Sequence, residues 1–182
     1  MKGIILLANY FEDVEALITI DMLRRAKITV DLVSMNDTLE VITQSNIKIK
    51  ADKIVTEINP NDYDFLIIPG GKATFLTHHN SMVTSTFVKS FMDQHKLVAT
   101  ICAAPSILGR LGYLDNLPFT CFPSCEKYMP KGIYQSNEDV VVANNIITSK
   151  AAGTTFNFAK AIIKYLANDQ LANDTLNSVY YK

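Results

Sequence analysis

Cys102 is the residue of this sequence best placed to do chemistry. It follows the apolar, β-type run 97–101, and a helix is expected to begin near Pro105, because proline is favoured in a first helical turn. Such a strand-to-helix turn holds a side chain out over the sheet, and the partial positive charge of a helix N-terminus favours a thiolate over a thiol. A buried cysteine that only packs is the alternative, and position alone leaves both open.

Three acidic residues open the first predicted helix: Glu12, Asp13 and Glu15. Negative charge is favourable at a helix N-terminus, so exposed carboxylates are the simplest interpretation. Glu15 also lies within the apolar stripe of that helix, beside Ala16, and can therefore point inward. A carboxyl buried beside a thiolate tends to keep its proton, because burial and like charge both raise its pKa, and it can then work as an acid/base.

A glycine turn, Pro69-Gly70-Gly71, follows another buried strand. Two glycines allow backbone N–H groups to approach an anion or a developing oxyanion, although a tight turn alone would also need them. No Walker loop and no Gly-x-Gly-x-x-Gly occurs, so the sequence carries no phosphate or dinucleotide signature.

The histidines and the other two cysteines are weaker candidates. His78, His79 and His95 lack metal-ligand spacing with a cysteine, and we expect them in solvated positions. Cys121 and Cys125 supply two sulfurs but not the four ligands of a zinc site, so we predict neither a metal site nor a cofactor. Cys121 is a candidate resolving thiol for an oxidised elbow cysteine, with packing as its alternative role.

The elements that must position these residues alternate along the chain, which predicts one doubly wound α/β domain over residues 1–182, with a mostly parallel sheet and helices on both faces. Ligands bind beyond the carboxyl ends of the strands in such sheets, so segments 8–15, 69–72 and 101–105 should meet. We expect strands over 3–8, 28–34, 64–71, 97–101 and on both sides of residues 144–145, a hairpin around 44–46, and helices over 11–26, 80–96, 105–112, 152–169 and 171–182.

Composition excludes several classes of function. A formal net charge of −1 provides no basic face for nucleic acid or for an anionic membrane surface, and the apolar runs are too short to span a bilayer. We interpret the N-terminus as a strand rather than a signal peptide. An odd count of three cysteines then argues against a disulfide framework and favours a cytoplasmic protein.

Together these segments resemble the DJ-1/ThiJ/PfpI superfamily. The resemblance covers nearly the whole chain and rests on FEDVEA, DMLRRA, YDFLIIPGG, the elbow ATICAAP and ITSKAAGTTFNFA. It is closer to the DJ-1/ThiJ-like branch than to the PfpI proteases. Those proteases carry a histidine directly after the cysteine, where this chain has Ala103, which argues against peptidase activity.

The resemblance implies a flavodoxin-like sandwich, similar to class I glutamine amidotransferases, and a homodimer. It also implies that Cys102 is the reactive cysteine and Glu15 its protonated partner. Gly70 and Gly71 would then border the site, and Ala103 would contribute a backbone N–H.

Two positions depart from the family pattern. DJ-1 itself has a histidine where Phe122 stands, which leaves Glu15 as the main acid/base. Lys150 stands where the family has an arginine and keeps the charge without the forked guanidinium.

Two functions follow as expectations. One is a cytosolic, stress-protective enzyme with cofactor-independent glyoxalase or deglycase activity, in which Cys102 attacks a small electrophilic dicarbonyl such as methylglyoxal. The other is a redox sensor or redox-regulated chaperone that works through oxidation of Cys102. A binding module with little chemistry is a third interpretation.

Overall fold

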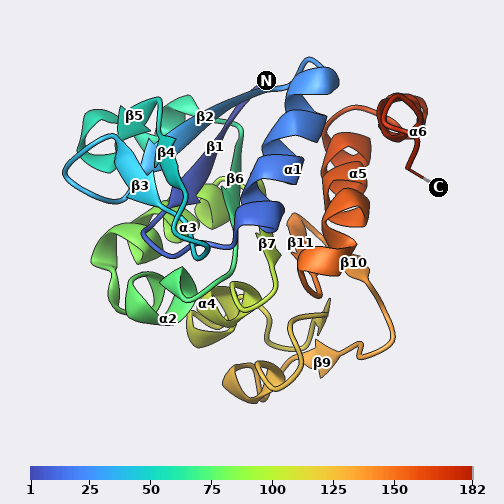
Figure 1. Ribbon diagram of the computed structural model, residues 1–182. Coiled ribbons are helices and arrows are strands. Elements are labelled where there is room, and N and C mark those ends of the chain that lie inside the picture. The colour runs from blue at the N-terminus through green and yellow to red at the C-terminus, as the bar shows by residue number, and fades with distance from the viewer. Residues whose placement is uncertain (182) are drawn as a thin grey trace.

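A seven-stranded sheet forms the middle layer of the computed structural model, which describes residues 1–181 (Figure 1). All neighbouring strands are parallel except β10 and β11. This confirms the predicted mostly parallel α/β sheet. Across the sheet, the strands are β10 (Val140–Ala143), β11 (Ile146–Ser149), β7 (Leu97–Ile101), β6 (Phe65–Ile68), β1 (Lys2–Leu7), β2 (Thr29–Ser34) and β5 (Lys53–Ile54).

Helices cover both faces of this sheet (Figure 1). One face carries α1 (Asp13–Arg25) and α5 (Thr155–Leu166), which pack side by side, with α6 (Asp169–Asn177) against α5. The other face carries α3 (Met82–Asp93) and α4 (Pro105–Arg110). The short helix α2 (Ala73–Leu76) follows the glycine turn.

The alternation of side chains along β1 explains the two faces. Ile5 and Leu7 pack in the cluster shared with α1 and α5, whereas Ile4 and Leu6 pack in the cluster shared with α3 and α4. All four side chains are fully buried. A strand covered on both faces must be apolar at every position, which is why the sequence shows a continuous run here.

Smaller elements lie outside the main sheet. The predicted hairpin exists as β3 (Glu40–Ile42) and β4 (Lys48–Lys50), which form a separate two-stranded sheet. The two-residue strands β8 (Pro118–Phe119) and β9 (Ile133–Tyr134) were not predicted, since runs this short leave no periodic signal. Short 3-10 helices span Val55–Glu57, Pro60–Asp62, His78–Asn80, Glu126–Tyr128 and Ala152–Thr154.

The residues that α1 buries differ in part from the apolar stripe expected from helical spacing. Val14 and Leu17 have the spacing of core residues, but they are 40% and 37% exposed. Ala16, Ile20 and Leu23 are buried instead.

The strand order changes direction beside β1. The chain passes from β1 to β2 on one side and later returns to β6 and β7 on the other. Because these strands are parallel, the residues after Leu7, Ile68 and Ile101 meet at one edge of the sheet. The predicted meeting of three strand ends at a topological switch point is therefore confirmed. Within residues 1–181, no helix has the length and apolar character needed to cross a bilayer.

Candidate active site

Cys102 occupies a sharp turn between β7 and α4. Its φ is +64°, in the left-handed region that non-glycine residues seldom adopt. Its N–H donates to the Ser149 carbonyl at 2.9 Å, and its own carbonyl accepts from the Phe122 N–H at 2.8 Å. Below it, the Ala104 N–H donates to the Ile101 carbonyl at 3.0 Å and closes the turn. Backbone bonds to two neighbouring segments thus hold the conformation that the elbow pattern predicted.

The glycine turn after β6 lies directly against this elbow. A Cβ on Gly70 would stand 2.7 Å from the Cys102 Cβ and 2.8 Å from Glu15 Oε2. Gly71 has a φ of +86°, and a Cβ there would stand 2.5 Å from the Glu12 backbone nitrogen. A larger residue at position 70 would push the cysteine and the glutamate apart, and one at position 71 would collide with the backbone of residues 10–12, so both glycines are required by space.

Glu15 points inward from the first turn of α1, as its place in the apolar stripe predicted. It is fully buried, and its Oε2 accepts from the Gly70 N–H at 2.7 Å. Its Oε1 has no hydrogen-bond partner among the described residues. Burial raises the pKa of Glu15 to about 7, against the opposing effects of the Cys102 thiol and the Gly70 N–H. A carboxyl with a pKa near neutrality and a free oxygen can both take and give a proton.

The pKa of Cys102 moves opposite to the prediction made from the helix N-terminus. Burial raises the pKa of this thiol, and the nearby Glu15 carboxylate raises it further. The N–H groups of Gly71 and Ala103 lower it by a smaller amount. The helix that follows is also short, with six residues. Burial and mutual repulsion therefore oppose ionisation of both groups at once, so the Cys102 thiol and the Glu15 carboxyl compete for a single negative charge.

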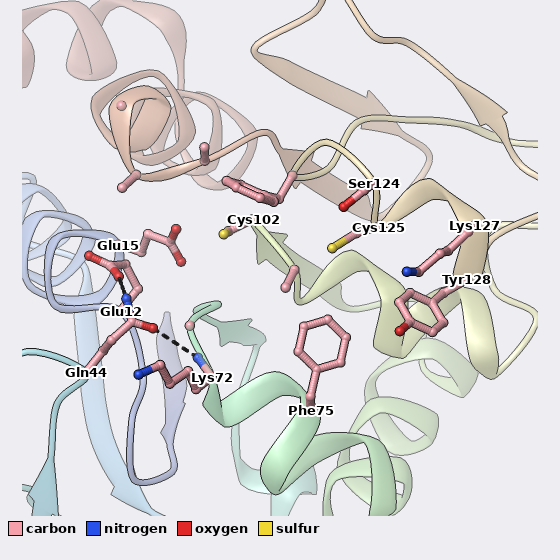
Figure 2. A pocket seen from close by; sticks show the side chains of 16 residues that line it. Glu12, Glu15, Gln44, Lys72, Phe75, Cys102, Ser124, Cys125, Lys127 and Tyr128 are labelled. Carbon is pink, nitrogen blue, oxygen red and sulfur yellow. Dashed lines mark hydrogen bonds between the residues drawn. The ribbon is translucent and has the colours of Figure 1, made fainter.

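A cavity of about 620 Å³ opens in front of this pair (Figure 2). This volume is in the usual range for small-molecule sites. Most of its surface is apolar, and lysine side chains lie at its exposed rim. The residues that line it are Glu12, Glu15, Gln44, Gly71, Lys72, Phe75, Cys102, Ala103, Phe122, Ser124, Cys125, Lys127, Tyr128, Ala151, Ala152 and Gly153.

An aromatic wall on one side of this cavity was missed at the sequence level. The rings of Phe75 and Tyr128 lie 5.7 Å apart, and His79 lies 5.0 Å from Phe75 and 5.5 Å from Tyr128. These residues come from α2 and from two separate 3-10 helices. Their spacing in the sequence does not indicate that they lie together. Phe75 alone could have been predicted near the site, because it follows the glycine turn closely in the sequence.

The expected solvation of the histidines is wrong for two of the three. His78 is buried, with Nδ1 3.0 Å from Thr84 Oγ1, and burial lowers its pKa to about 4. His79 is half-buried, with Nε2 2.8 Å from Ser106 Oγ, and burial lowers its pKa as well. Only His95 is exposed as expected. Both rings follow α2, and the His79 ring also packs edge-on against Phe75 and Tyr128.

The two remaining cysteines differ in their relation to the cavity. Cys121 is fully buried and is not part of the lining, whereas Cys125 is part of it. The structure therefore fits a packing role for Cys121 and makes Cys125 the thiol that shares the cavity with Cys102. All three cysteines are free thiols. No cluster of three or more candidate metal ligands occurs within residues 1–181.

Of the two residues that depart from the family pattern, one lines the cavity and the other does not. Phe122 lines the cavity and is 46% exposed, and its backbone N–H contacts the Cys102 carbonyl. Lys150 lies outside the lining, with Nζ 3.7 Å from Asp139 Oδ1.

Comparisons with known proteins agree with this fold. The chain is 31% identical to protein DJ-1alpha of Drosophila melanogaster, covering 99% of this chain and 84% of that protein. It is also 31% identical to protein DJ-1 homolog B of Arabidopsis thaliana over 87% of this chain, which spans only 36% of that longer protein. The structure of oxidised Toxoplasma gondii DJ-1 superposes with a TM-score of 0.92 at 30% identity, covering 99% of this chain and 98% of that one.

The fold is thus that of the flavodoxin-like α/β proteins of the DJ-1 superfamily. A sequence model of the DJ-1/PfpI family matches residues 1–165. The chain belongs to the DJ-1/PfpI family, which includes cysteine-dependent enzymes and whose DJ-1 members are commonly homodimers.

Proposed function

We propose that this protein is a stress-protective, cytoplasmic enzyme of the glyoxalase or deglycase type, which converts a reactive dicarbonyl without a cofactor. The observation that carries the proposal is the buried Glu15 carboxyl, with a pKa of about 7 and a free oxygen, beside the Cys102 thiol at the wall of the cavity. A general base works best when its pKa lies near the working pH. Glu15 can therefore activate a thiol that would otherwise keep its proton.

In the first step, Glu15 takes the thiol proton while the sulfur of Cys102 forms a bond to the aldehyde carbon of a compound such as methylglyoxal. The electron pair of the C=O bond moves to oxygen, and the backbone N–H groups of Gly71 and Ala103, which lie at the Cys102 sulfur, can donate to this developing charge. Glu15 then returns the proton to that oxygen, which completes a hemithioacetal.

In the second step, the Glu15 carboxylate removes the proton from the carbon that carries the sulfur. The electron pair shifts into the adjacent C=O bond and gives an enediolate. The hydroxyl on the sulfur-bearing carbon then passes its proton to the oxygen of the neighbouring carbon and becomes a carbonyl, while Glu15 delivers its proton to that neighbouring carbon. This internal redox step oxidises one carbon, reduces the other and leaves a thioester of a 2-hydroxy acid. Water then adds to the acyl carbon, the C–S bond breaks, and the thiol regains a proton. The sum is dicarbonyl plus water giving a 2-hydroxy acid such as lactate.

The test is consumption of methylglyoxal and formation of lactate by purified protein without glutathione or added metal. We expect Cys102→Ala to abolish turnover and Glu15→Gln to lower kcat by about 10²-fold or more. Cys121→Ala is the matched control, because it removes a buried thiol outside the cavity and should retain activity. Unchanged turnover in Cys102→Ala would refute the proposal.

A second candidate function is redox sensing through Cys102. It is supported by the oxidised state named for the Toxoplasma gondii DJ-1 structure, a relative with 30% identity to this chain. A thiol oxidised to sulfenic or sulfinic acid beside Glu15 would have a hydrogen-bonding partner in that carboxyl. Exposure to mild peroxide, followed by mass measurement of the peptide that contains Cys102, tests this role. An unmodified cysteine would count against it.

A further inference from the structure

We propose that Cys125 is the resolving thiol of this site and forms a reversible disulfide with Cys102 after Cys102 is oxidised by a peroxide. This inference rests on the proposed reactivity of Cys102 but not on the dicarbonyl chemistry. It assigns to a residue of the cavity wall the role for which the sequence had offered Cys121 as a candidate.

The first support is shared access. Cys102 and Cys125 line the same cavity, and Figure 2 shows the Cys125 sulfur projecting from its loop toward the side on which Cys102 lies. Cys125 is only 6% exposed, so a reaction partner must reach its thiol through this cavity. Cys121 is fully buried and absent from the lining. Of the two remaining thiols, Cys125 alone faces the space in which Cys102 would be oxidised.

The second support is the short backbone connection between the two cysteines. The Phe122 N–H donates to the Cys102 carbonyl at 2.8 Å, and the Phe122 carbonyl accepts from the Cys125 N–H at 3.0 Å. One residue therefore links both backbones. A disulfide needs a Cβ–Cβ separation of about 3.8 Å. Residues 120–125 belong to neither a helix nor a strand, and we expect closure to occur by a shift of this segment.

The chemistry balances with a peroxide as the only oxidant. The Cys102 sulfur attacks hydrogen peroxide, the O–O bond breaks, and the sulfur becomes a sulfenic acid as one water is released. The Cys125 sulfur then attacks the Cys102 sulfur, the S–O bond breaks, and the departing hydroxide takes the Cys125 proton as a second water. Two electrons have left the thiol pair. A thiol reductant returns them and restores both thiols.

The proposal predicts that the product at Cys102 depends on the peroxide concentration, because disulfide formation competes with further oxidation of the sulfur. Disulfide formation within the chain does not depend on peroxide concentration, whereas conversion of sulfenic to sulfinic acid needs a second peroxide molecule. Equimolar peroxide should therefore give the disulfide, and a large excess should give Cys102 with two added oxygens.

The experiment is peptide mapping of the intact wild-type protein after equimolar hydrogen peroxide, with alkylation of the remaining thiols. We expect a linked pair of peptides that contain Cys102 and Cys125, a fall from three free thiols to one, and recovery of all three after reduction. Non-reducing electrophoresis should show no covalent dimer. Two results would overturn the inference: a link between two chains, or a doubly oxygenated Cys102 together with an alkylatable Cys125.

Variants separate this inference from the proposed function. With two equivalents of peroxide, Cys125→Ala should lose the linked peptide and carry Cys102 irreversibly to sulfinic acid, whereas the control Cys121→Ala should keep the link. If Cys102 of the wild type becomes sulfinic without forming the link at equimolar peroxide, the resolving role fails and the reactivity of Cys102 stands. If peroxide leaves Cys102 fully alkylatable, the resolving role and the redox-sensing role fail, whereas the proposed enzyme activity is decided separately by dicarbonyl turnover. The wild-type map decides the point even if a variant does not fold.

Discussion

The replacement of Glu15 by glutamine tests the central physical argument, because Glu15 controls the proton on Cys102. In the wild type, burial and the Glu15 carboxylate both raise the pKa of the Cys102 thiol. Glutamine keeps the size of the side chain and removes its charge. We therefore expect the pKa of Cys102 to fall in Glu15→Gln, although burial still holds it above the value of an exposed cysteine.

The size of this fall follows from the contact between the two groups. Two unit charges about 4 Å apart interact by about 4 kcal/mol at an effective dielectric constant of about 20. That free energy corresponds to about three pKa units. The contact itself is close, since a Cβ placed on Gly70 would lie 2.7 Å from the Cys102 Cβ and 2.8 Å from Glu15 Oε2.

The assay is the rate of alkylation at Cys102 against pH, read for that residue alone by mass spectrometry. Glu12→Gln is the matched control, because Glu12 lines the same cavity and has only a minor effect on Glu15. The opposite result would refute the reasoning. If Glu15→Gln raises the pKa of Cys102 or leaves it unchanged, then Glu15 is protonated in the wild type and donates to a thiolate, as the family resemblance implied.

Four further predictions follow from the structure. Because the pKa of Glu15 rises from 4.5 to about 7 on folding, its contribution to stability is present below pH 4.5 and is lost as pH rises to 7. The unfolding free energy of wild type should fall by about 3 kcal/mol relative to Glu15→Gln over that range, measured by denaturant titration. Gly70→Ala should lower dicarbonyl turnover by about 10²-fold, since its Cβ pushes the reacting pair apart. Phe158→Ala removes a fully buried ring of α5 and should cost about 3–5 kcal/mol in thermal or denaturant unfolding. We propose that the exposed Val14 and Leu17 of α1 lie in the interface of the expected homodimer, so Leu17→Glu should weaken the dimer at least tenfold by sedimentation, whereas Met82→Glu at a highly exposed position of α3 should not.

The strands and the meeting of their ends were predictable because buried parallel strands are apolar at every position. The runs that became β1, β6 and β7 are of this kind, and each is followed by a residue of the site. The ends of these strands bring segments 8–15 and 101–105 together, whereas the family resemblance assigned Glu15 as the partner of Cys102. Inward placement of Glu15 followed from its position beside Ala16 in a helical stripe, and the structure confirms it.

What the sequence did not reveal depends on burial and on contacts between distant segments. The helix after Cys102 was expected to lower the pKa of the thiol, but burial and a second acidic group outweigh it, and neither can be measured along the chain. His78 and His79 are polar and lie next to Asn80, so they indicated a solvated loop. They are covered because the neighbouring segments fold over them. Cys125 likewise becomes a candidate resolving thiol only because its side chain lines the same cavity as Cys102 (Figure 2), which the sequence does not show.

The same burial that keeps Cys102 protonated makes Glu15 a base of suitable strength. Two neighbouring acids in a low-dielectric site cannot both ionise easily, so the first negative charge settles on the more acidic group, Glu15. A cationic histidine at position 122 would favour ionisation of both, but Phe122 carries no charge, and Lys72 and Lys127 lie at the exposed rim. We therefore expect the thiol proton to leave only as sulfur bonds to an electrophile. On this proposal, Cys102 reacts with small electrophiles that enter the cavity and stays protonated when none is bound.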